Sequence, residues 1–205
     1  MAPSVIRTDP EELQMSERNT VLRSMHDLGL AAWFGGSLMG AVALNGAADA
    51  EGGTWRSAAR IASVGWARWT PVNAAAIAMH LVGGSGLLAA NASRVGTQKG
   101  VAASTIAKTV LTGAALAVTA YSRVLGKKIE LASSDSPEAQ DKAVKHPIDT
   151  DKAQRDLARV QWVLPAVTGG LIVLNALHGE QQRPAEQMQG MFQRVGSMTA
   201  WPGMH

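Results

Sequence analysis

The 205-residue chain contains no cysteine. Without a thiol it forms no disulfide, no thiolate zinc site and no cysteine nucleophile. The patterns G-x-S-x-G, the Walker loop and H-E-x-x-H are also missing from the sequence. Their absence removes the usual sequence signals of serine hydrolases, nucleotide-binding proteins and zinc proteases. The distribution of charge along the chain is therefore the main remaining signal.

Charged residues are missing from three long stretches and nearly missing from a fourth. Residues 28–48, 70–93 and 160–179 carry no Asp, Glu, Lys or Arg, and residues 101–122 carry only Lys108. About 20 residues at a rise of about 1.5 Å cross a hydrocarbon core of about 30 Å. Mean hydropathy is only +0.02, but apart from Lys108 the charges lie outside these runs. The sequence predicts an all-α fold, a polytopic membrane four-helix bundle, as a single integral membrane domain over residues 1–205.

The predicted boundaries follow the charge pattern. Spans are expected at about 27–48, 70–93, 101–123 and 158–178, with a polar connection at 124–157 and an amphipathic, Met-bearing tail at 184–199. Thr70 and Pro71 have the character of an N-cap and first helical residue, so they predict the start of the second span. The spans are rich in Ala and Gly, which favour insertion into lipid less strongly than larger apolar residues do. A soluble four-helix bundle is therefore the alternative.

An interfacial amphipathic helix is predicted after span one, at about residues 54–69. Its tryptophans recur every three or four residues, while its arginines fall on other faces. An aromatic face opposite cations is typical of a helix lying in the bilayer interface. A more specific alternative is an anionic-lipid site formed by the arginines. The residues predicted at the lipid interface are Trp55, Arg56, Arg60, Trp66, Arg68 and Trp69.

Four spans place both termini on one side of the membrane and both long connections on the other. The connections carry eleven Lys and Arg residues, against seven on the side of the termini. The positive-inside tendency then predicts cytoplasmic connections and a cell-membrane protein with both termini outside. The cations flank membrane segments, so the net charge of +3 does not predict a nucleic-acid partner. Membrane lipid is the expected partner.

Small residues recur in the spans at positions that favour close helix packing. Helices in lipid associate through close backbone approach at such residues. The predicted packing positions are Gly36, Gly40, Gly83, Gly84, Gly169 and Gly170. Packing inside the bundle is the first interpretation, and a homo-oligomer or docking onto a larger membrane complex is the second.

The histidines are the candidates for site chemistry. His26 opens the first span and His178 closes the fourth, so both are expected at one membrane face beside Asp27. Neutral imidazoles and a carboxylate could bind zinc or copper there, or two histidines could hold a haem iron axially. The helix rise predicts that His80 lies about 15 Å deeper, too far to share a metal with that pair. The alternative is that these histidines are helix–helix hydrogen-bond partners or solvated caps.

The segment from His26 to Gly36 reads H-x6-W-x-G-G, with Trp33, Gly35 and Gly36 as its other fixed members. It resembles the first-span motif of small four-helix membrane families such as copper-resistance D-type domains and membrane protoporphyrinogen oxidases. The resemblance covers about eleven residues and implies that His26 is a haem or copper ligand. Asp27 departs from the pattern.

These observations favour a non-enzymatic integral membrane protein that acts as an accessory or scaffold subunit of a complex. The alternative is a haem- or copper-binding membrane redox protein that uses His26 with His178 or His80. A third hypothesis, a small transporter, requires polar groups along a path through the bilayer. The polar residues inside the spans are scattered, and they are Asn45, Asn73, Asn91, Lys108 and His80.

Overall fold

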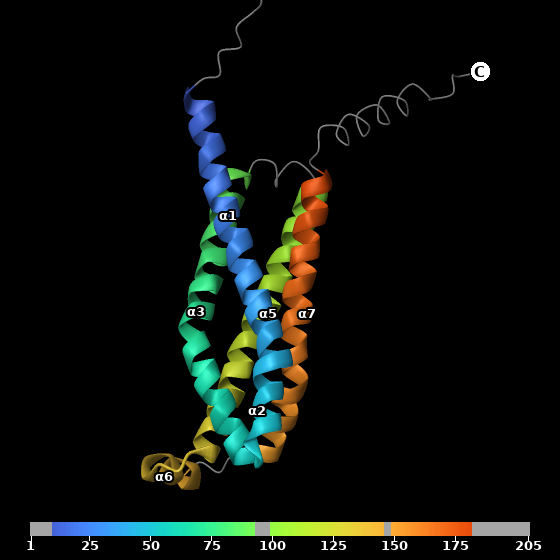
Figure 1. Ribbon diagram of the computed structural model, residues 1–205. Coiled ribbons are helices and arrows are strands. Elements are labelled where there is room, and N and C mark those ends of the chain that lie inside the picture. The colour runs from blue at the N-terminus through green and yellow to red at the C-terminus, as the bar shows by residue number, and fades with distance from the viewer. Residues whose placement is uncertain (1–9, 93–98, 146–148, 182–205) are drawn as a thin grey trace, which may run out of the picture.

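The computed structural model describes residues 10–92, 99–145 and 149–181 (Figure 1). All regular structure in this part of the chain is helical. Four helical segments are long and apolar enough to cross a membrane: Thr20–Gly52, Trp55–Ala90, Gly100–Ser133 and Thr150–Leu177. The predicted all-α four-helix bundle is confirmed, and the protein is a multi-pass membrane protein.

The first span is one continuous rod made of α1 (Pro10–Met39), the π-helical turn η1 (Gly40–Leu44) and α2 (Asn45–Gly52). The backbone N–H of Asn45 donates to the carbonyl of Gly40, which closes the wider π turn. The rod ends at Gly53, whose φ of 65° favours glycine. Thr54 then caps the next helix, its hydroxyl accepting from the N–H of Ser57 at 3.3 Å.

The second span differs from the sequence prediction. Residues 55–69, expected as a separate interfacial helix, are the first part of α3 (Trp55–Ala90), which is one continuous helix. Thr70 does not cap a helix, because its hydroxyl donates to the carbonyl of Trp66 at 2.7 Å, within α3. Pro71 also lies inside α3, a position that membrane helices tolerate. The tryptophan face of this segment has a protein partner in the first rod, so the helix continues along it.

The other hairpin is formed by α5 (Lys99–Ser133) and α7 (Thr150–Gln181). Most of the expected polar connection is helical, since α5 runs on to Ser133 and α6 spans Pro137–Lys145. Asp149 precedes α7 and caps it, its carboxylate accepting from the N–H of Lys152 at 2.8 Å. Pro165 lies buried within α7. The amphipathic tail predicted at 184–199 lies outside the described residues.

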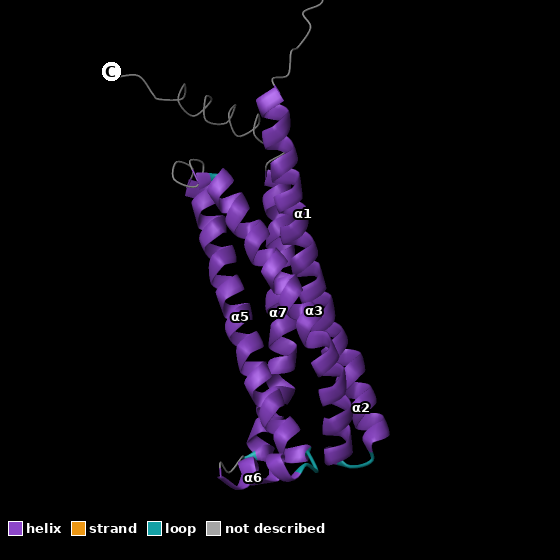
Figure 2. Ribbon diagram, turned by 90° about the vertical axis from the view of Figure 1, so that its left-hand side faces the viewer, coloured by secondary structure: helices purple, strands orange, loops and turns teal. Residues whose placement is uncertain are grey.

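The two hairpins pack side by side to form the bundle (Figure 2). Its core holds large buried side chains from α1 and α7, including Trp33, Leu30 and Leu171. At the α6 end, Leu125, Ile129 and Ala153 form a second buried cluster between α5 and α7. Many large apolar side chains instead face outward, as expected for helices in lipid.

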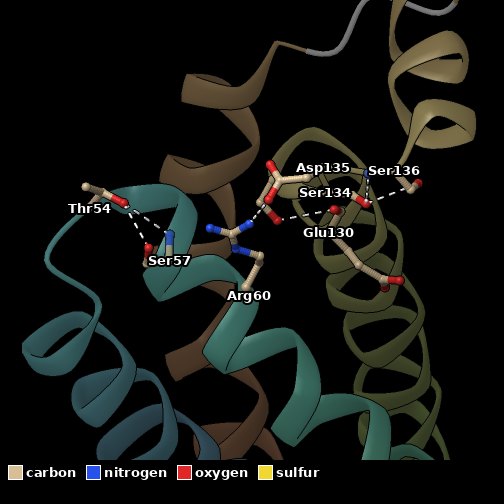
Figure 3. Close-up of polar contacts among 8 residues, drawn as sticks. Thr54, Ser57, Arg60, Glu130, Ser134, Asp135 and Ser136 are labelled. Carbon is tan, nitrogen blue, oxygen red and sulfur yellow. Dashed lines mark hydrogen bonds and ion pairs between the residues drawn. The ribbon is translucent and has the colours of Figure 1, made fainter.

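An ion pair joins the two hairpins at the α6 end (Figure 3). Arg60 of α3 points toward Asp135, which follows α5, and its guanidinium donates to that carboxylate. Both side chains are largely exposed, so the pair contributes at most about 1 kcal/mol. Arg60, expected at the lipid interface, therefore has a partner within the protein.

Candidate functional site

The clearest polar site inside the bundle is a pair of stacked histidines. His26 of α1 and His80 of α3 have ring centroids 4.0 Å apart and ring planes inclined by 19°. Nδ1 of His26 donates to the carbonyl of His80 at 2.9 Å, and Nδ1 of His80 donates to the carbonyl of His26 at 3.1 Å. A carbonyl oxygen is only an acceptor, so these contacts place a hydrogen on both Nδ1 atoms. We call this arrangement the histidine clasp.

Two glycines permit the backbones to meet at the clasp. A Cβ atom at Gly29 would lie 2.5 Å from the amide nitrogen of His80, and one at Gly83 would lie 2.5 Å from that of His26. At Gly84 it would lie 3.0 Å from Nδ1 of His26. Each histidine therefore has a glycine opposite its backbone on the other helix. Small residues at a crossing let carbonyls and ring nitrogens come within hydrogen-bond distance.

The contact between His26 and His80 corrects the expected separation of about 15 Å in depth. Gly53 lies 27 residues after His26 and 27 residues before His80, and the chain reverses direction there. An antiparallel helical hairpin brings residues equidistant from its turn to the same level. The depth estimate was wrong because it treated residues 54–69 as lying along the membrane surface, whereas they begin the second span.

Trp33 connects the clasp to the other hairpin. Its ring lies edge-on to that of His80, with centroids 6.1 Å apart, and its side chain has no exposed surface. Its indole N–H donates to the hydroxyl of Thr119 in α5 at 3.2 Å, and that hydroxyl donates to the carbonyl of Ala115. The indole thus gains the hydrogen-bond partner that a buried tryptophan requires.

A second polar contact lies at the π turn. Trp66 of α3 donates its indole N–H to the side-chain oxygen of Asn45 at 3.0 Å, and the Asn45 amide donates to Gln161 of α7 at 2.7 Å. The π turn adds a residue to the rod just before Asn45 and so changes the direction of its side chain. Asn45 joins three helices in this way.

Some of the residues predicted for packing or for lipid contact lie against a neighbouring helix, and others lie on the surface of the bundle. Gly36 of α1 and Gly40 of η1 lie against the rings of Trp69 and Trp66, so both tryptophans contact the first rod. Gly169 faces the Phe34 ring at 3.2 Å, while no atom lies within 4 Å of a Cβ placed at Gly170. Trp55 and Arg68 are exposed, and the guanidinium of Arg56 lies 5.2 Å from the Trp55 ring centroid.

The histidine clasp does not fit a haem. Two axial imidazoles bind iron from opposite faces of the porphyrin, so a haem held by both would separate their rings. In the clasp the rings are stacked on each other, and both Nδ1 atoms hold the opposite helix backbone. A haem between them would break the stacking and both hydrogen bonds.

The expected metal ligands are also not brought together within the described residues. In that part of the chain no three His, Cys, Asp or Glu side chains are grouped so as to hold a metal ion. Asp27 is exposed on α1. His178 belongs to α7, but its side chain lies outside the described residues. The ligand role that the resemblance implies for His26 stays a prediction.

One signal in the sequence could have revealed the clasp. His26-Asp-Leu-Gly29 and His80-Leu-Val-Gly83 both read H-x-x-G, and they lie 54 residues apart. The same offset relates Leu22 and Ala76, whose carbonyls face Gly83 and Gly29. A repeated motif on two antiparallel helices is the pattern of a pseudo-two-fold crossing. Spacing within each helix could not show that the two copies meet.

No protein-family model, curated protein or solved structure matches this chain. The functional argument therefore depends on the geometry of the bundle.

Proposed function

We propose that this protein is a non-enzymatic membrane subunit, a compact four-helix scaffold that associates within the bilayer with another membrane protein or with a second copy. The observation that carries the proposal is the exposure of α5. Of the most apolar 18-residue stretch of α5, a share of 6% is buried inside the bundle. The corresponding share for the first rod is 39%. A span this poorly covered by its own chain is available for contact with another helix.

The outward face of α5 has the composition of a helix-association surface. Ile106 and Val110 are each 64% exposed, and Gly113 and Ala117 continue the same face one and two turns further on. No atom lies within 4 Å of a Cβ placed at Gly113. Small residues between larger apolar ones allow a second helix to approach closely in lipid. We call this surface the α5 outer face.

The polar interior supports a structural role for the bundle. The histidine clasp, the Trp33–Thr119 contact and the Asn45 contacts all join helices to one another. Among the described residues, Ser122 has a buried side-chain oxygen without a hydrogen-bond partner. Side chains that hold helices together in pairs do not form the convergent set that catalysis requires.

The proposal is tested by measuring the mass of the native particle. The protein is extracted from membranes with its surrounding lipid in a polymer nanodisc, and its stoichiometry is determined by native mass spectrometry. We expect a stoichiometric complex for the unmodified chain and its loss in Gly113→Leu, which places a large side chain on the α5 outer face without an internal clash. Gly35→Leu is the matched control, since Gly35 also has open space around it. A monomer in the unmodified chain, or equal effects of the two variants, would contradict the proposal.

The location proposed with this function is the cell membrane, with the α6 end in the cytoplasm and both termini outside. The charge asymmetry of the connections supports that orientation.

A further inference from the structure

A groove runs along the outside of the bundle between α5 and α7. Its volume is about 460 Å³, and it is lined by apolar side chains of both helices: Leu111, Trp162, Val163, Ala166, Val167 and Gly170. The groove exists because Gly170 and Ala166 leave space on α7 where larger side chains would fill it. Residues 162–170 span about 12 Å of helix rise, close to the half-thickness of a hydrocarbon core of about 30 Å. We call this feature the α5–α7 groove.

Two arginines lie on the same face of α7, beyond the α6-side end of the groove. The series Arg155, Arg159, Val163, Ala166 and Gly170 advances by three or four residues, which places its members along one side of a helix. Val160 begins the charge-free run, so the arginines lie where the headgroup region meets the hydrocarbon core. Trp162 is 52% exposed beside them, a position typical of interfacial tryptophan.

The charge of these arginines is poorly neutralised by the protein. Asp156, the nearby acid, accepts from Lys152 at 2.6 Å and from the Tyr121 hydroxyl at 3.1 Å, both through one oxygen. Arg159 is 3.8 Å from the other oxygen, beyond hydrogen-bond distance, and its side chain is 77% exposed. Within the described part of the chain, no ion pair involves Arg155.

We propose that the α5–α7 groove binds an anionic phospholipid, whose phosphate is held by Arg155 and Arg159 and whose acyl chain lies along the groove. Guanidinium groups bind phosphate oxygens in a bidentate manner, which suits a headgroup at this level. The apolar lining suits a chain of one leaflet. The arginines therefore lie at the level of a phospholipid headgroup, and the apolar groove lies at the level of its acyl chain.

The headgroup half of the site is tested by lipid retention. The full-length protein is delipidated in detergent and titrated with phosphatidylglycerol or phosphatidylcholine, and bound lipid is counted by native mass spectrometry. We expect one phosphatidylglycerol to bind more tightly than phosphatidylcholine. The double variant R155Q/R159Q should weaken binding of phosphatidylglycerol about 30-fold, since each cation near a lipid surface contributes about fivefold to sixfold. The matched control K142Q/K145Q removes the same charge from α6 and should leave that affinity unchanged.

The acyl-chain half is tested with Gly170→Leu, which adds a large side chain to the groove lining at a position where a Cβ would meet no atom within 4 Å. We expect this variant to lose the bound phosphatidylglycerol, while Gly35→Leu retains it. Phosphatidylglycerol with brominated chains should quench the fluorescence of the unmodified chain more than that of W162F. Millimolar inorganic phosphate should not displace the lipid, which separates a lipid site from a site for free phosphate.

Three results would overturn the proposal. They are equal affinity for the two lipids, equal effects of R155Q/R159Q and K142Q/K145Q, and a dimer that Gly170→Leu abolishes, since a second copy would then occupy the groove. The thermal stability of each variant is first compared with that of the unmodified chain. If Gly170→Leu fails to fold, Ala166→Phe replaces it, and if R155Q/R159Q fails to fold, R159Q alone replaces it. Gly113→Leu should leave lipid retention intact, so failure of the proposed association and failure of the lipid site are distinguishable.

Discussion

At the scale of single residues, several polar groups within the spans hold helices together. His26 and His80 each donate to a backbone carbonyl of the opposite helix, and their rings cover one another. A helix carbonyl has a second lone pair, so it accepts from the imidazole without losing its own helical partner. The clasp therefore adds hydrogen bonds across the crossing without removing a hydrogen bond from either helix.

The clasp predicts energetic coupling between the two histidines. In a double-mutant cycle of His26→Ala and His80→Ala, we expect a coupling free energy of about 1 kcal/mol, because either substitution alone already removes the ring stacking. The measurement is thermal or denaturant unfolding of the detergent-solubilised protein. His80→Ala combined with Ser133→Ala, at the far end of the bundle, is the control and should be additive. Additivity in the histidine cycle as well would show that the rings do not stabilise each other.

At the scale of elements, the two hairpins differ in how their helices approach. In the first hairpin, α3 packs on glycines of the first rod along its length, with Trp66 and Trp69 lying on Gly40 and Gly36. In the second, Gly170 faces no side chain and a groove remains between the helices. The first hairpin is therefore the closely packed part of the bundle, and the second leaves space for a ligand.

Close packing predicts a strong effect of one methyl group at Gly83. In Gly83→Ala the new Cβ would lie 2.5 Å from two backbone atoms, the amide nitrogen of His26 and the carbonyl of Leu22. Backbone cannot rotate away as a side chain can, so we expect a loss of about 1–3 kcal/mol in unfolding free energy. Gly35→Ala, which meets no atom within 4 Å, should be neutral or slightly stabilising. Size-exclusion chromatography after a series of heat steps measures both, and equal midpoints would refute the close approach at Gly83.

At the scale of the whole molecule, the turn between α2 and α3 lies at the same end of the bundle as α6, as Figure 1 shows. The ion pair of Arg60 and Asp135 ties the two turns there. Among the described residues, one end thus carries α6 and the turn between α2 and α3, and the opposite end is where α1 begins and α3 finishes.

Because the chain has no cysteine, its orientation can be read from single introduced thiols. We expect a membrane-impermeant maleimide to label Ala90→Cys on intact cells, and Glu138→Cys only after the cells are permeabilised. Both residues are exposed and lie at opposite ends of the bundle. The unmodified chain is the blank. Labelling of Glu138→Cys on intact cells, with Ala90→Cys protected, would reverse the proposed sidedness.

The sequence by itself determined the class of the fold and the number of spans. Lipid solvates each helix almost independently of its neighbours, so a charge-free run of about 20 residues is a local property that can be read without tertiary structure. The register between helices was left to the tertiary structure. Charge marks where lipid ends and not where a helix ends, so residues 54–69 could be placed on the membrane surface or at the start of α3.

The tertiary structure decided that α3 continues and that Gly53 is the turn, and this brought His26 and His80 to one level. It likewise brought Trp66 and Trp69 onto Gly40 and Gly36, contacts that their spacing along one helix does not show. Contacts of this kind depend on how two backbones fit together over many turns. That fit is a property of a pair of helices, and neither sequence segment contains it alone.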